Sequence, residues 1–326
     1  MTTPILIDTD PGIDDALAML LALASPEVSV EAITTVAGNV SAETGTRNVF
    51  RLLDVVEPAR RPRVAQGAAA PLKRPLVTAM HVHGQDGLGN LDQFLDPEGR
   101  PRYSKLPVTL EMLDGADLIL ETAERFAGRL VIVALGPLTN VAQALQRDPG
   151  RVRRTARIVV MGGAVAVPGN VTPAAEFNIY VDPEAAASVF DAGLPIELVP
   201  LDVTRQVLLT RGDLQAALAR RPGRTTRFIE DFTLHGFAFA DSHEEGGIFL
   251  HDPLAVAVAV DPGLVGLESL HVAVECEGSL TRGMTVADRR AVPAHRKKAP
   301  TCRAALSVDA PRFLRLFLER LCPASA

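Results

Sequence analysis

Four aspartates lie within eight consecutive positions near the start of the chain, in the sequence DTDPGIDDA at residues 8–16. They are Asp8, Asp10, Asp14 and Asp15. Crowded carboxylates repel one another unless a cation joins them, and oxygen donors without histidine or cysteine favour a hard cation such as calcium or magnesium. One or two of these aspartates could instead cap a turn or interact with a helix dipole. Four together exceed what capping requires, so the pattern predicts a metal-binding turn.

A second group of polar residues lies much further along the chain and could bind a sugar. Asn170, Glu176 and Asn178 come shortly before a helix that we expect at residues 183–192. Their side chains could hydrogen-bond the two hydroxyls of a diol, but asparagine is also an ordinary residue of loops and helix caps. The residues alone leave both interpretations open.

His251 and Asp252 form another candidate pair, directly before Pro253 and the apolar sequence LAVAVAV. Asp252 could cap the helix that follows, with Pro253 at its first position. A histidine beside an aspartate could equally be a general acid next to a metal ligand. His83, which lies in a glycine-rich segment, could contact a ligand or simply be solvated.

The elements that must position these residues alternate between strands and helices. The apolar sequence PILI at residues 4–7 predicts a buried parallel strand, and IDDALAMLLALA at 13–24 predicts a helix. Further strands are expected at 28–36, near 64, and at 130–135, 157–161 and 196–200; further helices at 42–56, 116–127, 138–146, 183–192, 253–260 and 311–321, with two more within 211–240. The alternation predicts an α/β fold with an open, mostly parallel (mixed) Rossmann-like sheet and helices on both faces.

Several of the predicted strands are followed by polar residues or glycine. Asp10, Asn39, Gly136, Gly162 and Asp202 each come after an apolar run. The carboxyl ends of parallel strands lie at one edge of a sheet, and ligands bind at that edge in open α/β proteins. We therefore expect residues that are far apart in the sequence to line one pocket.

The composition is that of a folded protein without affinity for polyanions. Its 326 residues are 47% hydrophobic and carry a formal net charge of −6, with a pI of about 5.7. This charge balance predicts no binding to nucleic acid or membranes, and the longest apolar runs are too short to cross a bilayer. Three widely spaced cysteines and the lack of a basic leader predict a cytoplasmic protein.

Several common ligand-binding motifs are absent from the sequence. It contains no GxxxxGK[ST] loop, no GxGxxG at the first turn and no GxSxG elbow. Nothing in the sequence therefore indicates a phosphorylated substrate, a dinucleotide cofactor or a serine nucleophile.

Taken together, these residues resemble the inosine-uridine preferring nucleoside hydrolases. The resemblance rests on DTDPGIDDA at 8–16, ITTVAGN at 33–39, GPLTN at 136–140, MGG at 161–163, GNVTPAAEFNIYVDPEAA at 169–186, HDP at 251–253 and LTRGMTVAD at 280–288. It implies a single nucleoside-hydrolase-like domain over residues 1–326, assembled as a homodimer or homotetramer. It also implies hydrolysis of the N-glycosidic bond of a nucleoside to ribose and free base, in nucleoside catabolism and purine or pyrimidine salvage.

The resemblance further implies roles for individual residues. A calcium ion would be held by a metal set that consists of Asp10, Asp15, Asp252 and the backbone carbonyl of Leu135. The ribose would be bound by Asp14, Asn170, Glu176 and Asn178, with Asn39 and Met161 nearby. Asp10 would accept the proton of the attacking water, His251 would be the acid for the leaving base, and His83 would contact the base.

The nucleobase preference can be approached from what the chain lacks. Strongly purine-selective nucleoside hydrolases stack tryptophan rings around the base, and this chain has no tryptophan. The resemblance therefore implies a pyrimidine-preferring or broad enzyme. Candidate residues on the base side are His235, Phe237 and Phe239, within a helix expected near residues 224–240.

Two other functions are compatible with parts of the pattern. The first is a non-catalytic calcium- or ribose-binding protein on the same scaffold. The second is a phosphatase of the haloacid dehalogenase type, because Asp8-Thr9-Asp10 follows a strand as the nucleophile pair of such an enzyme would. The phosphatase also requires a lysine at the same edge, and no lysine of this chain follows a clear strand.

Overall fold

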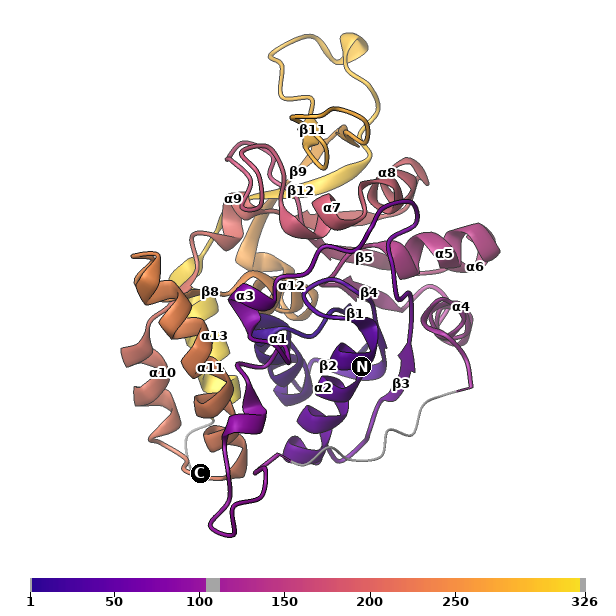
Figure 1. The fold of residues 1–326 in the computed structure, drawn as a ribbon. Coiled ribbons are helices and arrows are strands. Elements are labelled where there is room, and N and C mark those ends of the chain that lie inside the picture. Colours follow the sequence, from indigo (N-terminus) through magenta and orange to yellow (C-terminus); the bar gives the residue numbers. More distant parts are fainter. Residues whose placement is uncertain (1, 104–111, 323–326) are drawn as a thin grey trace.

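The core of the protein is a mixed eight-stranded sheet, seen in a computed structural model that describes residues 2–103 and 112–322. Its strand order is β3-β2-β1-β4-β5-β6-β12-β9, and every neighbouring pair is parallel except β12 with β9 (Figure 1). The strands are β1 (Thr3–Thr9), β2 (Val28–Thr35), β3 (Arg63–Gln66), β4 (Val131–Ala134), β5 (Arg157–Met161), β6 (Ile196–Val199), β9 (Val265–Leu270) and β12 (Cys302–Val308). The predicted mostly parallel α/β sheet is therefore confirmed.

Helices cover both faces of this sheet. Successive strand residues point to opposite faces, so Ile5 and Ile7 of β1 lie in one hydrophobic cluster and Leu6 lies in the other. The first cluster involves helices α1 (Ile13–Ala24), α2 (Ala42–Val56), α10 (Arg211–Leu218), α11 (Arg224–Ser242), α12 (His251–Val260) and α13 (Ala310–Leu321). The second involves α4 (Gly115–Arg125), α5 (Thr139–Arg147), α6 (Pro149–Val152) and α8 (Pro183–Asp191).

Short elements connect the main ones, and most of them were not expected from the sequence. They are the helices α3 (Met80–His83), α7 (Phe177–Val181) and α9 (Leu201–Thr204), the single-turn helices at Leu91–Gln93, Pro262–Leu264 and Ala294–Arg296, and the strand pairs β7 (Leu208–Leu209) with β8 (Ile248–Phe249) and β10 (Val272–Val274) with β11 (Thr285–Ala287). The β10–β11 hairpin projects beyond the end of the sheet at the top of Figure 1. Among the described residues, no helix is long and apolar enough to cross a membrane.

The order of the strands brings the predicted site residues to one edge. The parallel strands β1, β2, β4, β5 and β6 end on the same side of the sheet, and the segments after them begin there. α12 packs against α1, with the first turn of each helix at this edge. Residues separated by more than two hundred positions are therefore neighbours.

Candidate active site

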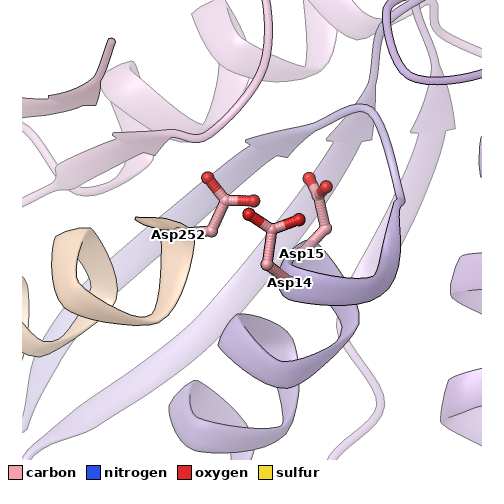
Figure 2. Close-up of side chains that lie close together, drawn as sticks. All are labelled: Asp14, Asp15 and Asp252. Carbon is pink, nitrogen blue, oxygen red and sulfur yellow. The ribbon is translucent and has the colours of Figure 1, made fainter. Parts of the chain in front are cut away.

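Three aspartates converge where α1 and α12 begin. One carboxylate oxygen from each of Asp14, Asp15 and Asp252 can be chosen so that the three atoms lie within 4.8 Å of one another. Figure 2 shows these side chains pointing toward each other, two from α1 and one from α12. Because all the donors are carboxylate oxygens, the cluster fits a hard divalent cation better than zinc or copper.

Asp10 lies beside this cluster, and its carboxylate is closely confined. Its Oδ2 accepts a hydrogen bond of 2.7 Å from the backbone N–H of Asn39. A Cβ atom added at Gly38 would come within 2.0 Å of Oδ2, and one added at Gly136 would come within 2.6 Å of Oδ1. The space for the Asp10 carboxylate therefore depends on these two glycines.

Three buried oxygens of the acidic turn lack the partners that such atoms normally have. In the described part of the chain, Asp8 Oδ2, Asp10 Oδ1 and Asp14 Oδ1 have no hydrogen-bond partner; Asp14 belongs to the cluster and Asp10 lies beside it. Most buried polar atoms are paired, and leaving one unpaired is costly. A cation, or hydroxyl groups of a ligand, would provide the missing partner.

The pKa values reflect the same crowding. Burial, and next the charge of Asp15, raises the pKa of Asp14 to about 8 and holds that of Asp10 well above its usual range. Burial and the charge of Asp14 do the same for the pKa of Asp252. Without a cation the cluster therefore holds protons near neutral pH, and a bound cation would displace them.

Asp15 both caps a helix and belongs to the acidic cluster, and the sequence had left open which of these roles the aspartates of this turn have. Its carboxylate accepts hydrogen bonds from the backbone N–H of Gly12 at 2.9 Å, from the side chain of Asn39 at 3.1 Å, and from the hydroxyl of Thr9. The first bond caps α1. Asp15 is fully buried at the same time and belongs to the acidic cluster, so capping and cluster membership do not exclude each other.

The residues that the resemblance predicts to bind ribose are held by hydrogen bonds to the backbone. The Glu176 carboxylate accepts N–H groups from Gly163 at 2.8 Å, Asn178 at 2.9 Å and Ile179 at 3.2 Å, at the N-terminus of α7. Burial nevertheless raises its pKa. These bonds orient the carboxylate without a charged partner among the interactions described for it.

Asn178 bridges the ends of two strands. Its side-chain amide donates to the carbonyl of Leu135 at 2.6 Å and to that of Met161 at 3.3 Å. A carbonyl oxygen has two lone pairs, so the Leu135 carbonyl can still accept one more partner. Asn170 accepts the N–H of Phe177 at 3.0 Å through its side-chain oxygen.

Of the two predicted histidines, His83 is buried and His251 is half-buried, and both imidazole rings are neutral at pH 7. Nδ1 of His83 accepts the backbone N–H of Ile13 at 3.0 Å, so the ring carries its hydrogen on Nε2. Burial lowers its pKa to about 3. Nδ1 of His251 lies 2.7 Å from the hydroxyl of Thr204, and burial together with the positive charge of Arg205 lowers the pKa of His251 to about 4.

A pocket of about 410 Å³ opens above the cluster. Among the predicted site residues its wall includes Asp14, Asn39, His83, Leu135, Met161, Asn170, Glu176, Asn178, His251 and Asp252. Asp10 and Asp15 are fully buried and do not line the pocket. The structure therefore brings the predicted residues together, with two of them behind the wall.

Besides the predicted Phe239, the outer part of the pocket contains residues that sequence reasoning missed. Phe239 stacks on His243 with ring centroids 4.1 Å apart, and His81 meets Phe239 edge-on at 6.2 Å. Arg205, Glu245 and Phe249 also line the pocket. The four-residue spacing of Phe239 and His243 on α11 was a usable signal, because such residues share one face of a helix.

The other two base-side candidates lie elsewhere. Phe237 is buried, with the guanidinium of Arg211 4.7 Å from its ring centroid. His235 is near Gly89 and is not part of the pocket wall. Of the three candidates on α11, the structure brings only Phe239 to the pocket.

Comparisons with known proteins agree with this geometry. Residues 5–315 match the family model described as inosine-uridine preferring nucleoside hydrolase. The chain is 40% identical to the pyrimidine-specific ribonucleoside hydrolase RihA of Salmonella typhimurium, over 98% of this chain and 99% of that protein. It is 39% identical to the probable uridine nucleosidase 2 of Arabidopsis thaliana, over 97% of each.

Solved structures are also similar along almost the whole chain. The plant nucleoside hydrolase PpNRh1 superposes with a TM-score of 0.88 at 35% identity, over 99% of this chain and 100% of that chain. The purine-preferring ribonucleoside hydrolase from Gardnerella vaginalis superposes with a TM-score of 0.87 at 33% identity, over 98% of each.

Proposed function

Since this chain belongs to the inosine-uridine preferring nucleoside hydrolase family, we propose that it cleaves pyrimidine nucleosides in preference to purine nucleosides, with calcium as its metal. It is a nucleoside hydrolase, an enzyme that hydrolyses the N-glycosidic bond of a ribonucleoside to ribose and free base. The observation that most directly supports metal-dependent hydrolysis is the convergence of Asp14, Asp15 and Asp252 beside a pocket of about 410 Å³.

Members of this family are metal-dependent in general, and the donors present here fit a hard cation. We propose that Asp10, Asp15, Asp252 and the Leu135 carbonyl hold calcium. Among the described residues Asp10 Oδ1 has no hydrogen-bond partner, and the Leu135 carbonyl that accepts from Asn178 has a second lone pair, so both observations support this set. When bound, calcium would supply positive charge that orients the vicinal hydroxyls of the ribose and lowers the pKa of a water molecule.

The remaining polar residues would bind the sugar. Asp14, Asn170, Glu176 and Asn178 line the pocket and offer carboxylate and amide groups to the ribose hydroxyls, with Asn39 and Met161 nearby. Glycosidic cleavage passes through a ribosyl cation. Buried carboxylates around the sugar would stabilise this positive charge, because they act at short range and without competing water.

Asp10 is the proposed general base. Its carboxylate is fully buried and lies beside the cluster, so it can take up a proton without competition from bulk water. The carboxylate would take up the proton that the attacking water loses.

His251 is the proposed leaving-group acid and His83 a proposed contact of the base. Both lowered pKa values keep the rings neutral at pH 7. His83 carries its hydrogen on Nε2, and His251 would donate a hydrogen bond to the base from the ring nitrogen that carries its hydrogen. A neutral imidazole that lost its one N–H proton would become imidazolate, so full proton transfer from His251 requires the ring first to take up a second proton from solvent, and negative charge on the departing base favours that uptake.

The proposed pyrimidine preference rests on three observations. The chain contains no tryptophan. The relatives at 39–40% identity are named as pyrimidine-specific or uridine enzymes, although a purine-preferring enzyme is similar at 33%. The outer pocket offers Phe239 and two histidines, His81 and His243, as smaller stacking surfaces.

The proposal also covers the domain organisation, the oligomeric state and the location of the protein in the cell. We propose one nucleoside-hydrolase domain over residues 1–326, a homodimer or homotetramer, and a cytoplasmic location. Continuous similarity over residues 5–315 supports the single domain. Three cysteines without disulfide partners support a reducing compartment.

The test of substrate class is ribose release from uridine, cytidine, inosine, guanosine and adenosine under identical conditions. We expect kcat/KM for uridine to exceed that for inosine, because the pocket lacks large indole surfaces. Inosine or guanosine favoured over uridine by about a hundredfold or more, a difference of about 2.7 kcal/mol, would refute the pyrimidine preference. Calcium and ribose binding without release from any nucleoside would instead favour a binding protein on this scaffold.

A further inference from the structure

The short helix α9 connects two parts of the pocket that come from different regions of the sequence. It follows β6, and its first residue, Leu201, donates its N–H to the carbonyl of Gly163 at 2.9 Å. Asp202 accepts the N–H groups of Val165 and Ala166, each at 2.8 Å. α9 is therefore fixed to the segment that follows β5, where the ribose-side residues begin.

Thr204 is at the other end of this helix and contacts His251. Its side chain is fully buried, and its hydroxyl lies 2.7 Å from Nδ1 of His251. The His251 ring also lies against Phe249, with ring centroids 5.8 Å apart. An imidazole has two nitrogens, so with Nδ1 engaged by Thr204 only Nε2 is left for a ligand in the pocket.

We propose that Thr204 is a positioning residue for the leaving-group side: its hydroxyl donates to Nδ1 of His251, which keeps the ring hydrogen on Nε2 and directs that atom into the pocket. The inference rests on the proposed role of His251 toward the departing base. It adds a residue that never touches the substrate but determines which nitrogen of His251 can serve it.

The burial of Thr204 favours this direction of the hydrogen bond. Its hydroxyl is fully buried, and among the described residues its hydrogen-bond partner is Nδ1 of His251, so donation to Nδ1 satisfies the O–H group. At His83 a backbone N–H likewise donates to Nδ1, so Nε2 carries the hydrogen. Donation by Thr204 to His251 gives both pocket histidines the same tautomer. The opposite direction, from Nδ1–H to the Thr204 oxygen, would leave Nε2 of His251 without a hydrogen and able only to accept.

Leaving groups of different basicity separate this role from a structural one. Uridine releases a base that benefits from a hydrogen-bond or proton donor, whereas 4-nitrophenyl β-D-ribofuranoside releases a stabilised anion that needs no such help. We therefore expect Thr204→Val to lower kcat for uridine about tenfold, part of the contribution typical of a general acid. Its kcat for the nitrophenyl riboside should change less than about twofold.

Three further variants complete the design. Thr204→Ser keeps the hydroxyl and should retain uridine turnover to within about twofold. The double variant Thr204→Val/His251→Ala should hydrolyse uridine no more slowly than His251→Ala alone. Both substitutions remove the same contribution, the hydrogen bond from His251 to the departing base. Thr122→Val is the matched control, since Thr122 is a buried threonine of α4 whose hydroxyl donates to the Leu118 carbonyl.

A spectroscopic measurement keeps the inference testable even if turnover fails. The ring ¹⁵N shifts of His251, assigned with His251→Ala, should report the Nε2–H tautomer in the wild type and a mixed or reversed population in Thr204→Val. Equal losses on both substrates, additive effects in the double variant, or an unchanged tautomer would overturn the role of Thr204. If the wild type hydrolyses neither uridine nor the nitrophenyl riboside, the result refutes the proposed function instead.

Discussion

At the scale of single residues, the acidic turn combines two requirements that usually conflict. The buried carboxylates of Asp10, Asp15 and Asp252 lie close to the half-buried Asp14. This crowding out of water raises the pKa values of all four, although carboxylates must be ionised to hold a cation. The protein tolerates this because Asp15 also caps α1 and Asp10 accepts the N–H of Asn39. Among the described residues Asp10 Oδ1 and Asp14 Oδ1 have no hydrogen-bond partner, and a cation at the cluster would supply the missing positive charge.

The pH dependence of the metal-free protein follows from the pKa of Asp14. An aspartate whose folded pKa of about 8 lies above its unfolded value contributes stability that is present below the unfolded pKa and is lost as the pH rises through 8. Asp14→Asn removes the ionisation, so in chelator it should raise the melting temperature relative to wild type more at about pH 9 than at about pH 5. Thermal unfolding measures this difference.

Calcium provides the internal control for that measurement. Added calcium should stabilise the wild type most at the higher pH, where fewer protons have to be displaced. A melting-temperature difference between Asp14→Asn and wild type that is the same at both pH values would contradict the raised pKa.

Which residues could be found from the sequence depended on their chemistry. Motifs with strong chemical signatures, such as DTDPGIDDA and HDP, marked residues that the structure brings to one pocket. Thr204, Arg205, His81 and His243 carry no such signature, because an ordinary threonine or surface histidine becomes significant only through its neighbours. Their roles depend on contacts between distant segments.

At the scale of elements, the long buried strands and amphipathic helices followed their sequence patterns closely, to within two residues at most ends. β12 was missed, because its alternation of buried and exposed residues at Cys302–Val308 is weak and it pairs with β6 from more than a hundred positions away. The two-residue strands β7 and β8 and the short helix α9 are stabilised by tertiary contacts rather than by their own sequence.

The α11 helix supplies the part of the pocket that should contact the nucleobase. Phe239 faces the pocket between His81 and His243. Phe239→Ala should raise KM for uridine about tenfold with a smaller effect on kcat, because base–aromatic stacking contributes about 1–3 kcal/mol to binding. Steady-state kinetics with uridine measure both constants.

The control for this prediction lies on the same helix. Leu234 is 43% exposed and does not line the pocket, so Leu234→Ala should leave KM unchanged. A fall in kcat without a rise in KM for Phe239→Ala would show that Phe239 acts on the chemical step and not on base binding.

At the scale of the whole molecule, the parallel sheet explains why the site could be anticipated at all. β1, β2, β4 and β5 end at one edge, so residues from position 10 to position 178 meet there, and the packing of α12 on α1 adds His251 and Asp252. The alternation of strands and helices predicted this edge. It could not predict which loops fold over the pocket, because that depends on side-chain packing and not on periodicity.

The measurement that tests the central claim most directly is uridine hydrolysis with calcium and after chelation, for the wild type and Asp10→Ala. Asp191→Ala, an exposed aspartate at the end of α8, is the matched control. We predict calcium-dependent ribose release that falls about a thousandfold or more in Asp10→Ala and is unchanged in the control. Full activity after rigorous chelation, or in Asp10→Ala, would contradict a calcium-dependent hydrolase with Asp10 as its base.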